Sequence, residues 1–287
     1  NRKKIMEKIS ILNRFDRKNY FSYPYPFFFI DNAYEDRIYS YLDKDYKLFH
    51  NYFEKKTQYK ENNIRLQIST EEFFESNLFQ NSIWKDFVEF HTSKFFFIEL
   101  MNIFEKDMEI IYPKINKIIK EKNNDIDFLN IRNEENKKKF QFVADCQPGI
   151  NTPNTFKSSV RDSHLDNTAE LVAGLFYLKD DNDKSTGGDL QVMEARQNKK
   201  IILHKKSSVK NISDLKLFKE IEYKKNKVVF FLNTSNSIHR VSPRSVAKTP
   251  RNLTNIIFET YLPDNKLFSV DSKKTKLIAK IKKLIIL

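Results

Sequence analysis

Three short apolar runs in the second half of the chain restrict its fold more than any other feature. Residues 171–178 read LVAGLFYL, residues 228–232 read VVFFL, and residues 253–261 read LTNIIFETY. Runs of this length that are rich in β-branched and aromatic side chains, and that are bounded by charged turns, are typical of buried strands. We therefore expect a two-sheet β structure in this half of the chain.

The first part of the chain is predicted to be mostly helical. Its segment 23–30, YPYPFFFI, is expected to be an extended entry because its prolines block a helix. Amphipathic spacing and capping residues predict helices at 33–42, after Ser69, at 84–90 and at 95–104, with an interruption near Pro113. Polar residues 123–139 are expected to form a loop or a weak element.

These patterns predict one α+β domain in three parts. Residues 1–122 form a mainly helical part that packs on the core, residues 123–270 form the β core, and residues 271–287 form a basic amphipathic helix. We expect the helix to dock on the protein body, with a dimer contact or a membrane surface as alternatives. Its apolar stripe comprises Leu277, Ile278, Ile281, Leu284 and Ile285.

The amino-acid composition limits the cellular compartment and the kind of core that we expect for the protein. The single cysteine, Cys146, excludes an internal disulfide framework and is expected to be buried and inert in a reducing, cytoplasmic setting. No apolar stretch approaches the roughly 20 residues that cross a bilayer, and residues 1–20 show no signal peptide. The 26 Phe and 13 Tyr are expected to fill the core, and the 4 Gly to hold backbone positions closed to other residues.

A net charge of +13 raises the question of a nucleic-acid surface. The lysines, however, are spread along the whole chain, and Lys, Asn, Ile and Phe are abundant together. We therefore interpret the charge as compositional, and we expect no dedicated nucleic-acid surface.

Two histidines and an aspartate stand in a pattern that suits a metal ion. In an extended segment, His164 and Asp166 leave the same face, while Leu165 points into apolar packing. His239 follows the apolar run 228–232, where a third ligand could complete a site. Two neutral imidazoles and one carboxylate suit iron(II) with adjacent open positions.

Arg251 opens the last predicted strand, and its guanidinium could grip a dicarboxylate in bidentate fashion. Arg240 and Arg244 are rivals for this role, but they follow His239 too closely to point inward from the next strand. Each signal is weak alone. The ordered set is far more specific: H-x-D, an apolar strand, Gly-Gly-Asp-Leu at 187–190, a second apolar strand, histidine and arginine.

In this arrangement the sequence resembles the 2-oxoglutarate and iron(II)-dependent oxygenases. The segment HLDNTAELVAGLFYLKDDNDKSTGGDLQV is similar to the first metal motif and its strands, and FFLNTSNSIHRVSPRSVAKTPRNLTNIIFE is similar to the distal-histidine segment. The likeness, which includes PYPFFFIDNAYEDRIYSYL and SIWKDFVEFHTSKFF, extends from about Tyr23 to Leu262. One departure is Arg240, which stands where a glycine is common.

The resemblance implies a double-stranded β-helix (jelly-roll) core with an N-terminal helical layer. It implies that His164, Asp166 and His239 bind Fe(II) and that Arg251 holds the distal carboxylate of 2-oxoglutarate. Tyr177 is a candidate to add a hydroxyl to this co-substrate pocket, although a plain core tyrosine would look the same. The implied reaction uses molecular oxygen to oxidise, by hydroxylation or related chemistry, a substrate with release of succinate and CO2.

The substrate is not fixed by the sequence. We expect a small or carbohydrate-like molecule, with an anionic one as an option because arginines and Lys248 follow the distal histidine. Polar residues ahead of the metal motif could line the mouth of the site or form a solvated loop: Asn151, Thr155, Ser158 and Arg161.

Several alternatives stay open at this point. A nucleic-acid or protein-modifying oxygenase would carry the same ligands. A zinc hydrolase could also use them, but it would leave Arg251 unexplained. A non-catalytic binding protein would be expected to have lost a ligand. The oligomeric state is not indicated by the sequence.

Overall fold

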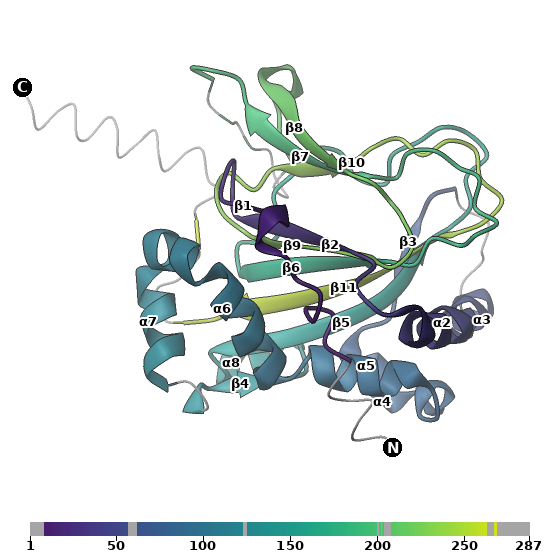
Figure 1. Ribbon diagram of the computed structural model, residues 1–287, viewed down its shortest axis with the longest axis horizontal. Helices are drawn as coiled ribbons and strands as arrows, with labels where there is room; N and C mark the ends of the chain where they lie inside the picture. Colours follow the sequence, from purple (N-terminus) through teal and green to yellow (C-terminus); the bar gives the residue numbers. More distant parts are fainter. Residues whose placement is uncertain are drawn as a thin grey trace, which may run out of the picture.

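Two β-sheets lie at the centre of the molecule (Figure 1). The computed structural model describes residues 9–56, 62–122, 125–199, 201, 203, 208–262 and 267–268. In this part of the chain the large sheet has the order β1-β2-β9-β6-β11-β5-β3, with β4 paired to β5, and the small sheet has the order β10-β7-β8. The strands are β1 (Tyr20–Phe21), β2 (Phe27–Asp31), β3 (Arg65–Gln67), β4 (Phe128–Leu129), β5 (Phe142–Asn151), β6 (Glu170–Tyr177), β7 (Leu190–Ala195), β8 (Leu215–Ile221), β9 (Lys227–Leu232), β10 (His239–Val241) and β11 (Arg251–Thr260).

Residues 154–164 extend the small sheet beyond β10. Isolated antiparallel bridges join Asn154 to Ala247, Ser158 to Arg244 and His164 to His239. From β5 to β11 the chain therefore crosses repeatedly between the two sheets: β5, β6, β9 and β11 lie in the large sheet, and 154–164, β7, β8 and β10 lie in the small one. This winding is that of a double-stranded β-helix, so the predicted α+β jelly-roll fold is confirmed.

The two faces of the large sheet differ because residues alternate along its strands. In β11, Ile256 and Phe258 join the main hydrophobic core, whereas Arg251 and Asn255 face a cavity between the sheets. β5 repeats the pattern, with Cys146 in the core and Gln147 on the cavity. Every residue of both strands is buried, because one face meets helices and the other the small sheet.

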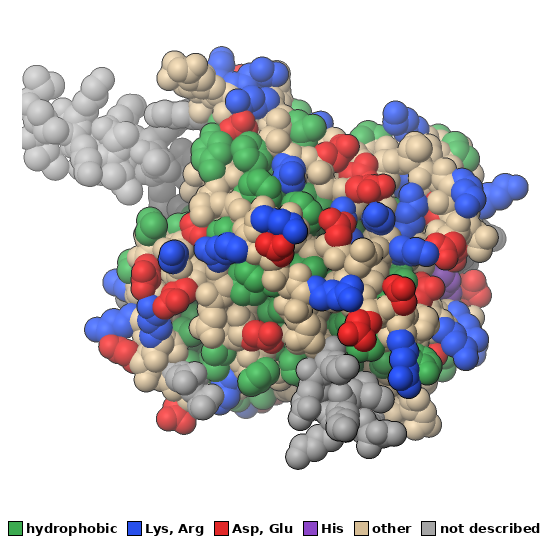
Figure 2. Space-filling model, in the orientation of Figure 1, with side chains coloured by type: hydrophobic (Ala, Val, Ile, Leu, Met, Phe, Trp, Pro, Cys, Tyr) green, Lys and Arg blue, Asp and Glu red, His purple; other side chains and the backbone are tan. Residues whose placement is uncertain are grey.

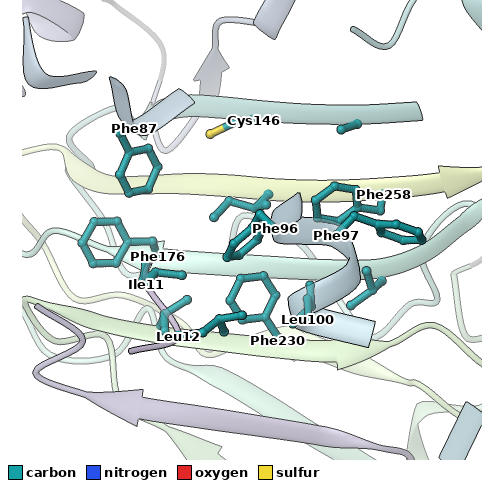
Figure 3. Close-up of a cluster of buried hydrophobic side chains, with 14 of the residues drawn as sticks. Ile11, Leu12, Phe87, Phe96, Phe97, Leu100, Cys146, Phe176, Phe230 and Phe258 are labelled. Carbon is teal, nitrogen blue, oxygen red and sulfur yellow. The ribbon is translucent and has the colours of Figure 1, made fainter. Parts of the chain in front are cut away.

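The helices cover the face of the large sheet opposite the small sheet (Figure 1). They are α2 (Asp36–Asp45), α3 (Lys47–Lys56), α4 (Thr70–Glu75), α5 (Ile83–His91), α6 (Lys94–Ile111), α7 (Pro113–Lys122) and the short α8 (Asn136–Lys139). Aromatic rings fill the space between these layers (Figure 3). Phe87 stacks on Phe176 at 5.8 Å between ring centroids, and Phe97 lies 5.1 Å from Phe258, which stabilises the layer contact. The predicted aromatic core is confirmed.

The N-terminal part is less purely helical than the sequence predicts. Its segment 27–31 is a full strand, β2, paired with β9, and β3 pairs with β5. The helix expected at 33–42 begins instead at Asp36, and the interruption near Pro113 is the point where α7 begins, because proline is tolerated in the first turn of a helix. The predicted C-terminal helix lies outside the described residues. Among those residues, no helix is both long and apolar enough to cross a membrane.

Candidate active site

The structure brings His164, Asp166 and His239 together at the edge of the small sheet. His164 and His239 are antiparallel neighbours whose backbones exchange two hydrogen bonds, of 3.0 and 3.1 Å. Asp166 lies between the rings: its Oδ1 is 3.5 Å from His164 Nε2 and its Oδ2 is 3.5 Å from His239 Nε2. The ligand atoms all lie within 4.8 Å of one another, so a single metal ion could contact all three side chains.

Backbone carbonyls fix the orientation of both imidazoles. His164 Nδ1 donates to the carbonyl of Asp162 at 2.6 Å, and His239 Nδ1 donates to that of Ser237 at 2.9 Å. Each ring therefore keeps its proton on Nδ1 and presents the Nε2 lone pair to the site, as metal-bound histidines commonly do. The Nε2 atom of His164 is buried and has no hydrogen-bond partner in the described structure, which a metal ion would provide.

The charge state of the triad also suits a cation. Burial lowers the pKa of His239 to about 4, so this imidazole is neutral at neutral pH. Burial opposes ionisation of Asp166, but His239, His164 and Arg161 outweigh it, and the pKa of the carboxyl lies well below its usual value. The triad thus offers at least one neutral imidazole and one carboxylate, and it leaves a bound divalent ion with net positive charge.

Arg251 extends into the same cavity from the start of β11. Its Nε donates to the carbonyl of Gly188 at 2.9 Å and its Nη1 to Asn151 Oδ1 at 3.1 Å, while Nη2 is buried without a partner. No carboxylate of the described residues forms an ion pair with it. A buried guanidinium of this kind is unfavourable unless an anion pairs with it, which indicates a ligand carboxylate.

Gly188 permits this placement of Arg251. Its φ of 79° is a left-handed conformation, and a Cβ atom there would lie 3.1 Å from Arg251 Nε. Tyr177 lies on the other side, with its ring centroid 5.1 Å from the guanidinium carbon. The Tyr177 hydroxyl is buried and has no partner, and burial raises its pKa, so it remains a neutral donor.

The rival arginines point elsewhere. Arg244 is buried in an ion pair with Asp183 at 2.8 Å, and Arg240 Nε donates to Gln191 Oε1 at 2.5 Å. Neither lines the cavity, and Lys248 is exposed. The expectation that the basic residues after the distal histidine jointly meet an anion is therefore wrong, with Arg251 as the exception.

Of the four polar residues predicted as candidates for the mouth of the site, two line the cavity and two do not. Asn151 and Arg161 line the cavity, and Arg161 lies 3.3 Å from Asp166 Oδ1. Thr155 and Ser158 do not line it: Thr155 contacts Asn62, and Ser158 accepts a hydrogen bond from Asn63.

The cavity has a volume of about 370 Å³ and is lined by both sheets. Several of its polar lining residues were not predicted from the sequence: Arg65, Gln67, Arg132, Gln147, Glu170 and Asn255. Gln147 and Asn255 could have been noticed as polar residues at alternating positions of apolar strands. Arg65 and Gln67 gave no signal, because their strand is three residues long and polar.

Comparison with known proteins agrees with this geometry. Residues 152–259 match the model of the 2OG-Fe(II) oxygenase superfamily. This span contains the triad, Tyr177 and Arg251, so the resemblance inferred from the sequence is confirmed there. Over this span the chain is similar to oxygenases, which are oxidoreductases whose cofactor is iron(II) and whose co-substrate is 2-oxoglutarate. No curated protein matches the chain.

Three of the solved structures that resemble this one have low sequence identity to it. A prolyl 4-hydroxylase from Phytophthora capsici is 14% identical over 99% of this chain and 75% of its own, with a TM-score of 0.43. A prolyl hydroxylase from Trichoplax adhaerens, in complex with a hypoxia-inducible-factor peptide, is 10% identical over 90% of each chain, with a TM-score of 0.40. HygX from Streptomyces hygroscopicus, with nickel and 2-oxoglutarate bound, is 10% identical over 89% of this chain and 87% of its own, with a TM-score of 0.40. These similarities are too distant to identify the substrate.

Proposed function

We propose that this protein oxidises a small molecule with consumption of 2-oxoglutarate and oxygen and release of succinate and CO2. His164, Asp166 and His239 hold the iron(II), and Arg251 with Tyr177 holds the distal carboxylate of 2-oxoglutarate. The observation that carries the proposal is one arrangement: three ligand atoms within 4.8 Å of one another, on the same cavity as a buried arginine that has no carboxylate partner.

The chain's own residues supply placement rather than redox chemistry. Iron(II), when bound, couples the oxidative decarboxylation of 2-oxoglutarate to oxidation of the substrate. Arg251 orients the co-substrate by a charge-assisted pair, and the Tyr177 hydroxyl donates to the same carboxylate. The walls of the cavity, among them Phe231, Leu175 and Leu190, exclude water from the reacting groups.

The size of the cavity supports a small substrate. Ligand cavities in proteins span roughly 300–1,000 Å³, and about 370 Å³ lies at the lower end, with room for the co-substrate included. On the face shown in Figure 2, Lys and Arg side chains are interspersed with Asp and Glu, so this face offers a nucleic acid no continuous basic patch. A carbohydrate-like molecule remains within the proposal.

Metal and product analysis tests this function directly. We expect purified protein to bind about one Fe(II) per chain under anaerobic conditions, and to release succinate from 2-oxoglutarate when oxygen is admitted. His164→Ala and His239→Ala should abolish succinate release while circular dichroism shows a retained fold. A protein that bound zinc in preference and formed no succinate would contradict the proposal and support a hydrolase or a binding protein.

A further inference from the structure

The inner face of the large sheet is divided into an apolar half and a polar half. On the side of β9, Phe231 and Val229 pack against Leu190 and Val192 of the small sheet. On the side of β5 and β3, the side chains that line the cavity are polar and charged. Gln147 and Asn151 on this side are buried, Arg65 is half-buried and Gln67 is exposed. A charged group that is withdrawn from water is unfavourable unless it has a partner, so the partners of each charged group indicate which ligand the cavity would accept.

Of the four arginines that line the cavity, two have a carboxylate partner. Arg132 lies 3.0 Å from Asp145 and 2.9 Å from Glu259, and Arg161 lies 3.3 Å from Asp166. Arg251 is the proposed partner of 2-oxoglutarate. Arg65 remains: within the described part of the chain it forms no ion pair, and its hydrogen bond goes to the neutral amide oxygen of Asn255, at 2.6 Å.

Arg65 reaches further along the cavity wall than Arg251 does. It starts level with Arg251, because both are register partners of Asn151 on β5. Its guanidinium donates to Asn255, which is four residues further along β11, or roughly 13 Å between backbone positions at about 3.3 Å per residue. Arg251 is instead held at the start of β11 by Gly188 and Asn151. The two guanidiniums therefore have different partners on one cavity wall, although they are close enough for the charge of Arg251 to lower the pKa of Arg65.

Among the described residues, the carboxyl groups of the cavity wall form no ion pair with Arg65. Burial, followed by the charges of Arg251 and Arg161, lowers the pKa of Arg65 to about 10, and the charge of Asp166 opposes this shift without reversing it. Arg65 therefore stays charged at neutral pH. Apart from Asp166, the carboxyl that lines the cavity is Glu170, and its Oε1 lies 4.0 Å from Arg132 Nη1 rather than beside Arg65.

We propose that Arg65 is the substrate-recognition residue of this cavity and that the substrate is a small molecule with a carboxylate or phosphate group, which pairs with this guanidinium. The proposal rests on the proposed function, because it places the anion beside the iron and 2-oxoglutarate sites. The neighbouring amides of Asn255, Gln147 and Gln67 are short polar groups that suit the rest of such a headgroup. The anionic substrate that the sequence left as an option is thereby assigned to Arg65 on β3 rather than to the loop after His239.

The test uses matched pairs of probes on protein whose co-substrate site is already filled. The protein is saturated with Mn(II) and 2-oxoglutarate, so that Arg251 is occupied, and then titrated by calorimetry. The pairs are 4-methylpentanoate with 4-methylpentanamide and glucose 6-phosphate with glucose; inorganic phosphate and acetate serve as bare anions. We expect the anionic members to bind at least tenfold more tightly than their neutral partners. The pair that shows the larger preference distinguishes carboxylate from phosphate.

Two variants assign the preference to Arg65. Arg65→Gln keeps a polar side chain but removes the charge, and should reduce the preference at least tenfold, whereas Arg65→Lys should retain part of it. The control is Arg196→Gln, an exposed arginine beyond β7, which should behave as wild type. The Kd of 2-oxoglutarate should be the same in all of these proteins.

The proposal is overturned if wild-type protein prefers no anion in any pair, or if Arg65→Gln keeps the preference. It is also overturned if Arg65→Gln weakens 2-oxoglutarate as strongly as a change at Arg251, because Arg65 would then belong to the co-substrate site. Succinate release in the absence of any substrate is measured in parallel. If wild-type protein showed no such basal succinate release, the proposed function would be contradicted. If it released succinate but bound no anion preferentially, only the role of Arg65 would be contradicted.

Discussion

Two guanidiniums face one cavity without a carboxylate partner, and the residues around them explain why they are tolerated. Arg251 is held by a carbonyl and an amide oxygen and lies 4.7 Å from the ring centre of Tyr223, so its cation contacts an aromatic face. These contacts position the group but do not neutralise it. The remaining stabilisation has to come from a ligand, which makes each arginine a measurable determinant of binding.

The substitution Arg251→Ala tests how much this arginine contributes to the binding of 2-oxoglutarate. Removing one partner of a buried charge pair typically costs about 2–5 kcal/mol, because the other charge stays buried and unpaired. We expect the apparent constant for 2-oxoglutarate to rise well over tenfold, with Fe(II) binding retained, as measured by succinate release against co-substrate concentration. Arg196→Ala, on the exposed surface, is the matched control. An unchanged constant in Arg251→Ala would remove this residue from the co-substrate site.

At the scale of elements, local sequence patterns predicted the metal site but not the polar side of the cavity that β5 and β3 form. His164, Asp166 and His239 could be predicted because an H-x-D pair and a histidine after an apolar strand are short-range patterns. The apolar strands β6, β9 and β11 were equally visible. β3 was not, because it is short and polar and becomes a strand only by pairing with the distant β5. Arg65 reaches the cavity through that pairing, which no local pattern records.

The same limit applies to the N-terminal strands. The FFFI segment contains a strand pattern, but its partner β9 lies two hundred residues away in the sequence. The prolines before it indicate an extended chain without indicating the sheet that it joins. The helices were easier, since periodicity and caps are local: Ser69 and Ser93 each accept a hydrogen bond from a backbone N–H in the first turn of α4 and α6.

The end of α5 carries an expected pH effect on stability. His91 is fully buried; its Nδ1 donates to the carbonyl of Phe87 at 2.7 Å, and its Nε2 accepts from the backbone N–H of Ile11 at 3.2 Å. Burial lowers its pKa from 6.5 to about 3. The unfolded chain therefore binds a proton between these values when the folded one does not, so stability is complete above pH 6.5 and is lost as the pH falls.

We expect this histidine to add a slope of about 1 kcal/mol per pH unit to the free energy of unfolding between pH 6 and pH 4.5. Urea unfolding of wild type and of His91→Gln over this range measures the difference in slope. Any loss of packing caused by the substitution lowers the free energy of unfolding equally at every pH and does not change this slope. Carboxyl groups titrate in both proteins and cancel in the comparison. Parallel curves for the two proteins would show that His91 is protonated in the folded state.

At the scale of the whole molecule, the stability of the fold depends in part on polar groups at the cavity that have no partner. His164 Nε2, Arg251 Nη2 and Asn151 Nδ2 are buried on the cavity wall without hydrogen-bond partners in the described structure, and Tyr177 Oη is a further such atom beside Arg251. Such groups lower the stability of the unliganded protein by about 1–3 kcal/mol each when nothing pairs with them. Ligands that supply the missing partners should therefore stabilise the fold as a whole.

Thermal unfolding with Mn(II) and 2-oxoglutarate tests this link between cavity and fold. A ligand at about 100 times its Kd stabilises the native state by about 2.7 kcal/mol, and each kcal/mol raises the Tm of a chain of this size by about 2–4 °C. We expect Mn(II) alone to raise the Tm and 2-oxoglutarate to raise it further by several degrees. Arg251→Ala should keep the first increment and lose most of the second, whereas His239→Ala should lose the first. If 2-oxoglutarate stabilised Arg251→Ala as much as wild type, the co-substrate would be bound by other residues, and the division of the cavity between Arg251 and Arg65 would be wrong.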